Sequence, residues 1–161
     1  MSRKVLVAGV GNIFLSDDGF GVEVARRLSG EDLPDGVKVV DFGIRGVHLA
    51  YELLDGYDTA ILVDAVPRGG QPGTVYIIEP RIDPSNHESA ALLNAHGMQP
   101  DAVLELLGVL GGHVERVFVV GCEPSTVEEG IGLSEPVDRA VDEAVHVVRQ
   151  LVAHREGSET W

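Results

Sequence analysis

Four short, uninterrupted apolar segments constrain the fold of this chain more than any other feature. They occupy residues 4–9, 37–41, 59–64 and 116–121. Apolar character without alternation is typical of strands covered on both faces, as in parallel sheets. Between and after these segments lie stretches with apolar residues at spacings of three and four, which indicate amphipathic helices. These stretches cover residues 19–28, 46–54, 100–110 and 136–154.

A fifth strand-like segment, residues 73–79, is expected to run in the opposite direction. Only the short, glycine-rich stretch 67–72 separates it from the preceding strand, which leaves no room for a helical crossover. We therefore predict a three-layer α/β/α sandwich whose five-stranded, mostly parallel sheet has one antiparallel strand. Residues 80–98 carry no clear periodicity and are expected to form a long irregular loop.

The length of the chain limits it to one domain. Its 161 residues, 44% of them hydrophobic, suffice for one packed core. We predict a single domain over residues 1–155 and a C-terminal tail over residues 156–161. The first apolar segment is too short for a signal peptide or a membrane span, so we expect a cytoplasmic protein. A monomer is expected, because the sequence shows no exposed apolar repeat.

The charge of the chain excludes some partners. Its net charge is −14, from 26 acidic and 12 basic residues, and the longest basic cluster is the pair Arg26–Arg27. Nucleic acids and anionic membranes both require a positive surface, so neither is an expected partner. The acidity either suits a basic or metal-bearing partner or mainly keeps a small protein in solution.

Two aspartates are expected to meet at the carboxyl edge of the sheet. Asp64 ends a buried strand, where its carboxylate needs partners to offset desolvation, and Asp18 lies in the loop after the first strand. Right-handed crossovers would give the first three strands the order 2-1-3, with that loop facing the end of the third strand. Asp18 and Asp64 would then converge. Alternatively, Asp64 only accepts backbone hydrogen bonds at a turn.

Other polar residues at this edge have simpler explanations. We expect Ser16, and one of the pair Asp17 and Asp18, to cap the helix that follows, which leaves a second role for Asp18 open. Asp41 closes the second strand at the same edge. His96 lies in the long loop, and a single loop histidine carries no assignment by itself.

Two further kinds of chemistry find little support in the sequence. The turn Gly9-Val-Gly11 follows a strand, as in nucleotide-binding oxidoreductases, but Phe14 replaces the third glycine of that motif. Two adjacent carboxylates would also repel a pyrophosphate. Cys122, the single cysteine, excludes an internal disulfide and fits a reducing compartment. It has no histidine or cation nearby in sequence to activate it, so we expect it to pack in the core.

Taken in order and spacing, several sequence elements resemble those of hydrogenase maturation proteases. They are G-V-G-N-I-F-L-S-D-D-G-F-G-V at 9–22, D-F-G-x-x-G at 41–46, V-D-A at 63–65, P-G-T at 72–74 and H-G at 96–97. V-G-C-E-P at 120–124 and G-L-S-x-x-V at 132–137 extend the resemblance to the last strand and the C-terminal helix. The resemblance therefore covers most of the chain.

This resemblance implies a function. Members of the family remove a short C-terminal peptide from the large subunit of nickel-iron hydrogenase after nickel insertion. The resemblance therefore implies a metal-directed, aspartate-rich endopeptidase whose partner is the large-subunit precursor. The metal ligands of the family fall on Asp18, Asp64 and His96. The first ligand is often Glu in the family, so Asp18 shortens its reach by one methylene.

The ligand types suggest how the metal is used. Two carboxylates and one imidazole should bind nickel less well than a thiolate site does, so we expect the nickel to be carried by the substrate and not held permanently. Asp41 is our candidate for catalysis, orienting or accepting a proton while the metal polarises the carbonyl or a water. The alternative function is that of a noncatalytic maturation chaperone, which binds the same precursor and senses its metal.

Overall fold

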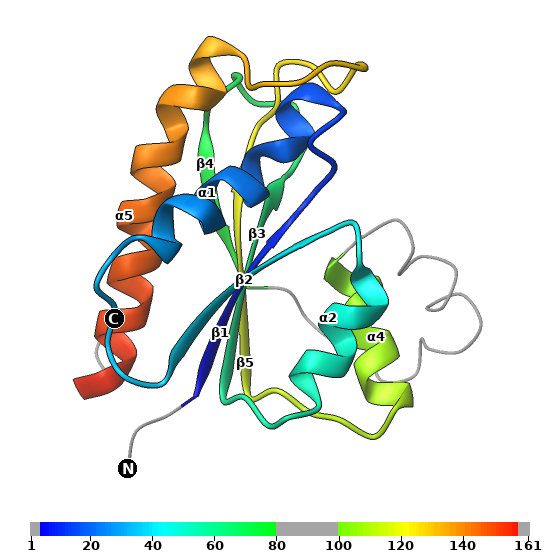
Figure 1. The fold of residues 1–161 in the computed structure, drawn as a ribbon, viewed down its shortest axis with the longest axis vertical. Coiled ribbons are helices and arrows are strands. Elements are labelled where there is room, and N and C mark those ends of the chain that lie inside the picture. The colour runs from blue at the N-terminus through cyan, green and yellow to red at the C-terminus, as the bar shows by residue number, and fades with distance from the viewer. Residues whose placement is uncertain (1–3, 80–99, 158–161) are drawn as a thin grey trace.

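The computed structural model describes residues 4–79 and 100–157 and contains a five-stranded sheet with the strand order β2-β1-β3-β5-β4 (Figure 1). The long loop expected over residues 80–98, including His96, lies outside the described residues. The strands are β1 (Val5–Val10), β2 (Val37–Gly43), β3 (Thr59–Ala65), β4 (Val75–Ile78) and β5 (Arg116–Cys122). β4 pairs with β5 in antiparallel orientation and the other pairs are parallel. The predicted fold class is confirmed, and so is the 2-1-3 order of the first three strands.

Helices cover both faces of the sheet (Figure 1). They are α1 (Phe20–Ser29), α2 (Gly46–Leu53), α4 (Pro100–Val109) and α5 (Glu135–Gly157), with a short 3-10 helix, η1 (Ser16–Gly19), ahead of α1. One core cluster joins the sheet to α2 and α4, and a second joins its other face to α1 and α5. β1, β3 and β5 are buried almost throughout, as their hydrophobic sequences predicted. The prediction of full burial is wrong for β2, which is half-exposed because it lies at the edge of the sheet. No helix within residues 4–79 and 100–157 has both the length and the apolar character needed to cross a membrane.

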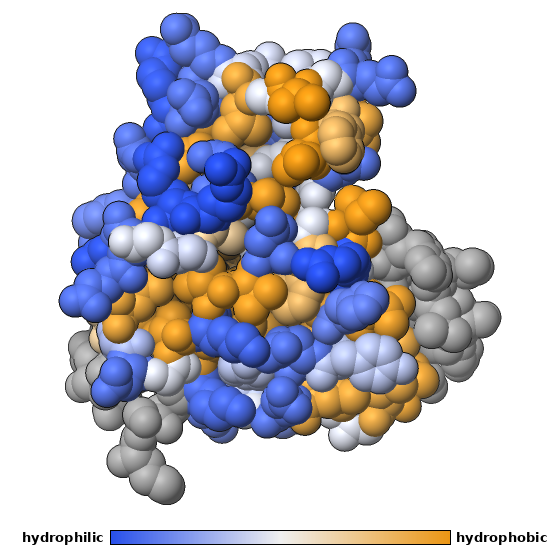
Figure 2. All heavy atoms as spheres, viewed as in Figure 1, coloured by the Kyte–Doolittle hydropathy of each residue, from blue (hydrophilic) through white to orange (hydrophobic). Residues whose placement is uncertain are grey.

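Apolar and hydrophilic residues are interspersed over the surface in view, and one group of apolar residues lies at the upper end of the molecule (Figure 2). In Figure 1 this end holds η1 and the loop between β5 and α5. It is also the end at which the four parallel strands finish, because β1 runs upward into η1 in this view. The carboxyl edge of the sheet and an apolar surface therefore lie at the same end.

The start of α1 packs unusually close to the sheet because glycines face each other there. A Cβ atom on Gly21 would lie under 3.0 Å from the carbonyl oxygens of both Val63 and Val10. A Cβ atom on Gly9 would likewise collide with the carbonyl oxygen of Gly21. The absence of side chains at these positions lets the helix begin directly against the ends of β1 and β3, which brings η1 to the carboxyl edge.

This close approach predicts that Gly21→Ala destabilises the protein by about 3 kcal/mol or more, because the added methyl collides with backbone atoms. Gly108→Ala is the matched control, since Gly108 is also helical and a Cβ there would meet nothing within 4 Å. The control should stabilise by roughly 0.5 to 1 kcal/mol through helix propensity. Urea unfolding measures both, and a Gly21→Ala variant as stable as the wild type would contradict the packing described.

Candidate functional site

Asp18 and Asp64 approach each other across the glycine that follows β1. A Cβ atom on Gly11 would lie 3.7 Å from Oδ1 of Asp64 and would collide with the backbone oxygen of Asp18. Gly11 also has a φ of 135°, a conformation that favours glycine. The turn after β1 can therefore close over the end of β3 only with glycine at this position, and the closure brings the two aspartates together.

The electrostatics of this pair are unfavourable in the absence of a cation. Burial raises the pKa of Asp64 well above its ordinary value, and the negative charge of Asp18 raises it further. The backbone N–H of Ala65, which donates to Oδ1 of Asp64 over 2.8 Å, offsets only part of this. Asp18 is oriented by the N–H of Asn12, 2.8 Å from its Oδ2. A positive ion between the two carboxylates would relieve both the desolvation and the repulsion.

The third residue of the predicted metal set, His96, lies outside the described residues. Within the part of the chain that is described, no group of three His, Cys, Asp or Glu side chains is arranged to hold a metal ion. The described residues therefore supply the Asp18–Asp64 pair, and the assignment of the full set as metal ligands stays a prediction.

Asp41 lies at the same edge of the sheet but apart from the pair. It is exposed near the end of β2, where it pairs in register with Gly9, and Gly9 pairs on its other side with Val63. Neighbouring strands are about 4.8 Å apart, so β1 separates Asp41 from β3 by roughly 10 Å. The guanidinium of Arg45 donates to the backbone carbonyl oxygen of Asp41 over 2.7 Å. This hydrogen bond fixes the local backbone and does not involve the carboxylate of Asp41.

Asp17 has a different role from the one expected. Neither η1 nor α1 has a side-chain cap, and the hydroxyl of Ser16 donates instead to the carbonyl oxygen of Glu128 over 2.7 Å. The prediction that these residues cap the helix is therefore wrong. The reason is that the loop between β5 and α5 lies against η1, where it offers donors to the carboxylate of Asp17 and an accepting carbonyl oxygen to the hydroxyl of Ser16.

The buried carboxylate of Asp17 ties η1 to that loop. It accepts hydrogen bonds from the N–H groups of Ser125, Thr126 and Ser134 and from the hydroxyl of Ser134, over 2.7 to 3.0 Å. We call Asp17 and these donors the Asp17 clamp. Burial acts to raise the pKa of Asp17, but the hydrogen bonds outweigh it and hold the pKa below its ordinary value. The clamp therefore fixes Asp17, the residue next to Asp18, through donors near both ends of the loop.

Glu123 is a second buried carboxylate at this edge, and sequence reasoning missed its role. Its side chain is 5% exposed, and its Oε1 accepts hydrogen bonds from the N–H groups of Arg68 and Gly70 and from the hydroxyl of Tyr76. It thereby holds the turn that follows Asp64. The hydrogen bond from Tyr76 lowers the pKa of Glu123 most strongly. Its position directly after a buried strand, like that of Asp64, is the signal that could have identified it.

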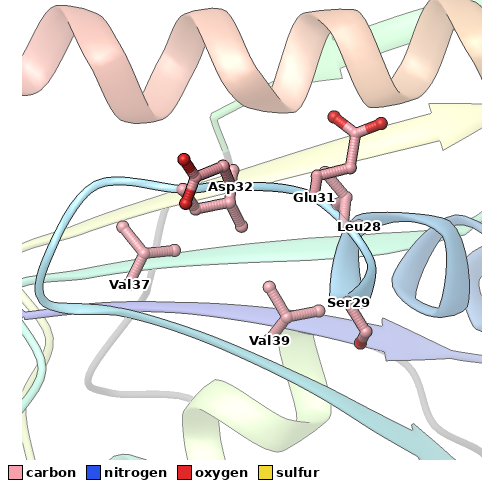
Figure 3. A pocket seen from close by; sticks show the side chains of 7 residues that line it. Leu28, Ser29, Glu31, Asp32, Val37 and Val39 are labelled. Carbon is pink, nitrogen blue, oxygen red and sulfur yellow. The ribbon is translucent and has the colours of Figure 1, made fainter.

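Two other features do not join the site. Cys122 is buried, and burial raises the pKa of its thiol to about 12, in keeping with the packing role expected for it. A cavity of about 350 Å³ lies between the end of α1 and β2, lined by Glu31, Asp32 and apolar side chains (Figure 3). It borders the beginning of β2, so it lies at the opposite edge of the sheet from Asp64.

The clamp predicts a pH-dependent loss of stability in Asp17→Asn. At pH 7 the substitution should lower the free energy of unfolding by about 2 to 4 kcal/mol, because the NH2 group of asparagine would face N–H donors where the carboxylate has an accepting oxygen. Folding lowers the pKa of Asp17, so the ionised carboxylate stabilises the folded protein. This stabilisation is complete above the pKa of the unfolded chain, about 4, and is lost as the pH falls through the pKa of the folded protein. The deficit should therefore shrink below about pH 4. Urea unfolding across pH measures it, with the exposed Asp35→Asn as control; an equal deficit in both variants would contradict the clamp.

Asp64→Asn should have the opposite effect on stability. The folded state raises the pKa of this carboxyl, so its ionised form costs stability at neutral pH, and the cost disappears where it is protonated in both states. The amide keeps the oxygen that accepts from Ala65. We expect the variant to be more stable by roughly 0.5 to 2 kcal/mol at pH 7 and equal to the wild type near pH 3. A variant that is less stable at pH 7 would contradict the electrostatics described.

Comparisons with known proteins agree on one family. The family model for hydrogenase maturation protease matches residues 22–151. The Escherichia coli hydrogenase 2 maturation protease is 32% identical over 155 residues, which cover 95% of this chain and 92% of the relative. The Rhizobium leguminosarum hydrogenase expression/formation protein HupD is 32% identical over 152 residues, covering 91% and 74%.

Solved structures agree with the sequence relatives. The hydrogenase maturating endopeptidase HybD from E. coli superimposes with a TM-score of 0.77 at 28% identity, covering 95% of this chain and 94% of that one. The hydrogenase 2 maturation peptidase from a Thaumarchaeota archaeon gives a TM-score of 0.73 at 32% identity, covering 94% and 99%. The chain therefore belongs to the hydrogenase maturation protease family, a family of peptidases.

Proposed function

We propose that this protein is an endopeptidase that removes the C-terminal peptide of a nickel-iron hydrogenase large-subunit precursor after nickel has been inserted. The observation that carries the proposal is the pair of aspartates, Asp18 and Asp64, which lie close enough to interact electrostatically at the carboxyl edge of the parallel strands. Open α/β sheets bind their ligands at this edge. The names of the relatives, which are maturation proteases and endopeptidases of hydrogenases, support the substrate class.

In this proposal Asp18, Asp64 and His96 bind to the nickel that the precursor carries. Burial and the neighbouring carboxylate of Asp18 both disfavour the ionised form of Asp64. A divalent ion presented by the substrate supplies a compensating positive charge. Carboxylate and imidazole ligands compete poorly with the thiolates of the precursor, so the protease can contact the nickel without removing it. Only a precursor that contains nickel can then make this contact with the protease.

Cleavage adds water across the scissile peptide bond, and Asp41 is the group we assign to proton transfer. The oxygen of the water forms a bond to the carbonyl carbon, the carbon–nitrogen bond breaks, and a proton reaches the leaving amine. Asp41 is exposed at the same edge and roughly 10 Å from β3, a spacing that leaves room for a peptide between it and the bound nickel. Its carboxylate accepts the proton of the water and returns it to the amine.

A reconstituted cleavage assay tests the function. Wild-type protein mixed with nickel-loaded precursor should yield a shortened large subunit, whereas nickel-free precursor should remain intact. Asp18→Ala and Asp64→Asn should lose cleavage of the loaded precursor by roughly a hundredfold or more, even though the second variant is expected to be the more stable protein. Binding of the loaded precursor by the wild type without any shortening would instead favour the noncatalytic chaperone.

The role of Asp41 has a separate test. Asp41→Asn should abolish cleavage and leave the affinity for the precursor within about twofold of the wild type, because an amide cannot accept the proton. The exposed aspartate Asp32, at the opposite edge of the sheet, provides the control variant Asp32→Asn, which should cleave normally. Full activity of Asp41→Asn would rule out the assigned role.

A further inference from the structure

Four large apolar side chains are exposed at the upper end of the molecule, where Figure 2 shows apolar residues at the surface. Ile13 and Phe14, in the loop after β1, are 45% and 61% exposed. Val127 and Ile131, in the loop between β5 and α5, are 50% and 80% exposed. We call these four residues the apolar rim. Exposure of this kind in a contiguous group marks a surface that another molecule covers.

Backbone hydrogen bonds join the two halves of the rim. The N–H of Gly130 donates to the carbonyl oxygen of Phe14, and the N–H of Ser16 donates to the carbonyl oxygen of Gly130, both over 2.9 Å. Leu15 and Gly130 thus form a parallel bridge between loops that are more than a hundred residues apart in sequence. Phe14 and Ile131 are the immediate neighbours of these bridged residues, so the rim is one surface.

The rim is a built structure and not a pair of loose loops. The Asp17 clamp fastens the same two loops through a fully buried carboxylate. Ser16 is held at a φ of 55°, a left-handed conformation that is costly for a residue other than glycine. A fold that keeps this strain and still leaves Phe14 and Ile131 in solvent presents them in a fixed position.

The rim is continuous with the candidate site. The N–H of Asn12 donates to Oδ2 of Asp18, and the side-chain oxygen of Asn12 accepts from the N–H of Phe14 over 2.9 Å. One residue therefore links the candidate metal-reading carboxylate to the first apolar side chain of the rim. A polypeptide with its metal at Asp18 necessarily passes near this surface.

We propose that the apolar rim docks an apolar segment of the hydrogenase precursor that has positive charge beside it. The inference rests on the proposed function and adds where the polypeptide is held. Glu128 and Glu129, both exposed, lie between Val127 and Ile131, so the matching surface combines apolar and basic side chains. A second copy of this chain fits less well, since a symmetric contact would bring these glutamates together and both copies carry a net charge of −14.

Paired double variants test the docking surface. Phe14→Ser with Ile131→Ser removes two rim side chains, and Tyr51→Ser with Val109→Ser removes two similarly exposed side chains, 56% and 49%, outside the rim. Biolayer interferometry gives the affinity for nickel-loaded and nickel-free precursor, and the cleavage assay gives kcat and KM. The rim variant should weaken binding of both precursors by roughly tenfold or more, with KM raised and kcat retained, whereas the control pair should match the wild type.

The outcomes separate this inference from the proposed function. The rim contacts polypeptide and not metal, so an equal weakening for both precursors supports docking. Binding by the rim variant equal to that of the wild type overturns it, whether or not the wild type cleaves. Weakening confined to the loaded precursor also overturns it, because the rim would then act only through the carboxylates. If the wild type binds but never cleaves, the proposed function fails while the binding data still decide the docking surface.

Discussion

The buried carboxylate of Asp17 is the interaction on which the functional end of this protein depends. Its four hydrogen bonds join η1, which carries Asp18, to the loop that leads into α5. The bridge between Leu15 and Gly130 and the hydrogen bond from Ser16 to Glu128 also join the two loops, but neither places a charged group between them. The connection through Asp17 fixes the position of Asp18 and exposes the apolar rim, so one buried charge organises both the proposed contact with the metal and the proposed docking of the polypeptide.

The half-buried carboxylate of Asp64 has the opposite environment. Asp17 has enough donors to favour its ionised form, whereas Asp64 receives one backbone hydrogen bond from the described residues and faces the charge of Asp18. Two carboxylates at one edge of the sheet thus have opposite electrostatic environments. In the proposed function, Asp64 lowers the stability of the fold and in exchange gives the site affinity for the positive charge of the metal that the substrate brings.

The sequence predicted those parts of the molecule that depend on regular patterns. Uninterrupted apolar strands located the parallel sheet, and the short glycine-rich link before β4 located its antiparallel strand. The strand order then brought Asp18 and Asp64 to one edge. The partners of Asp17 and Glu123 could not be predicted in this way, because these contacts join segments that meet through tertiary packing and not through local spacing. For Asp17 the donors are more than a hundred residues distant in sequence.

In the proposed function, Asp18 and Asp64 bind the nickel of the precursor. X-ray absorption at the nickel edge tests this binding directly, in a rapidly frozen mixture of the protease with nickel-loaded precursor. Nickel should gain additional oxygen or nitrogen ligands when wild-type protease is added, and fewer of them with the variant that combines Asp18→Ala and Asp64→Asn. A nickel coordination shell unchanged by wild-type protease, in a complex shown to be formed, would contradict this role of the two aspartates.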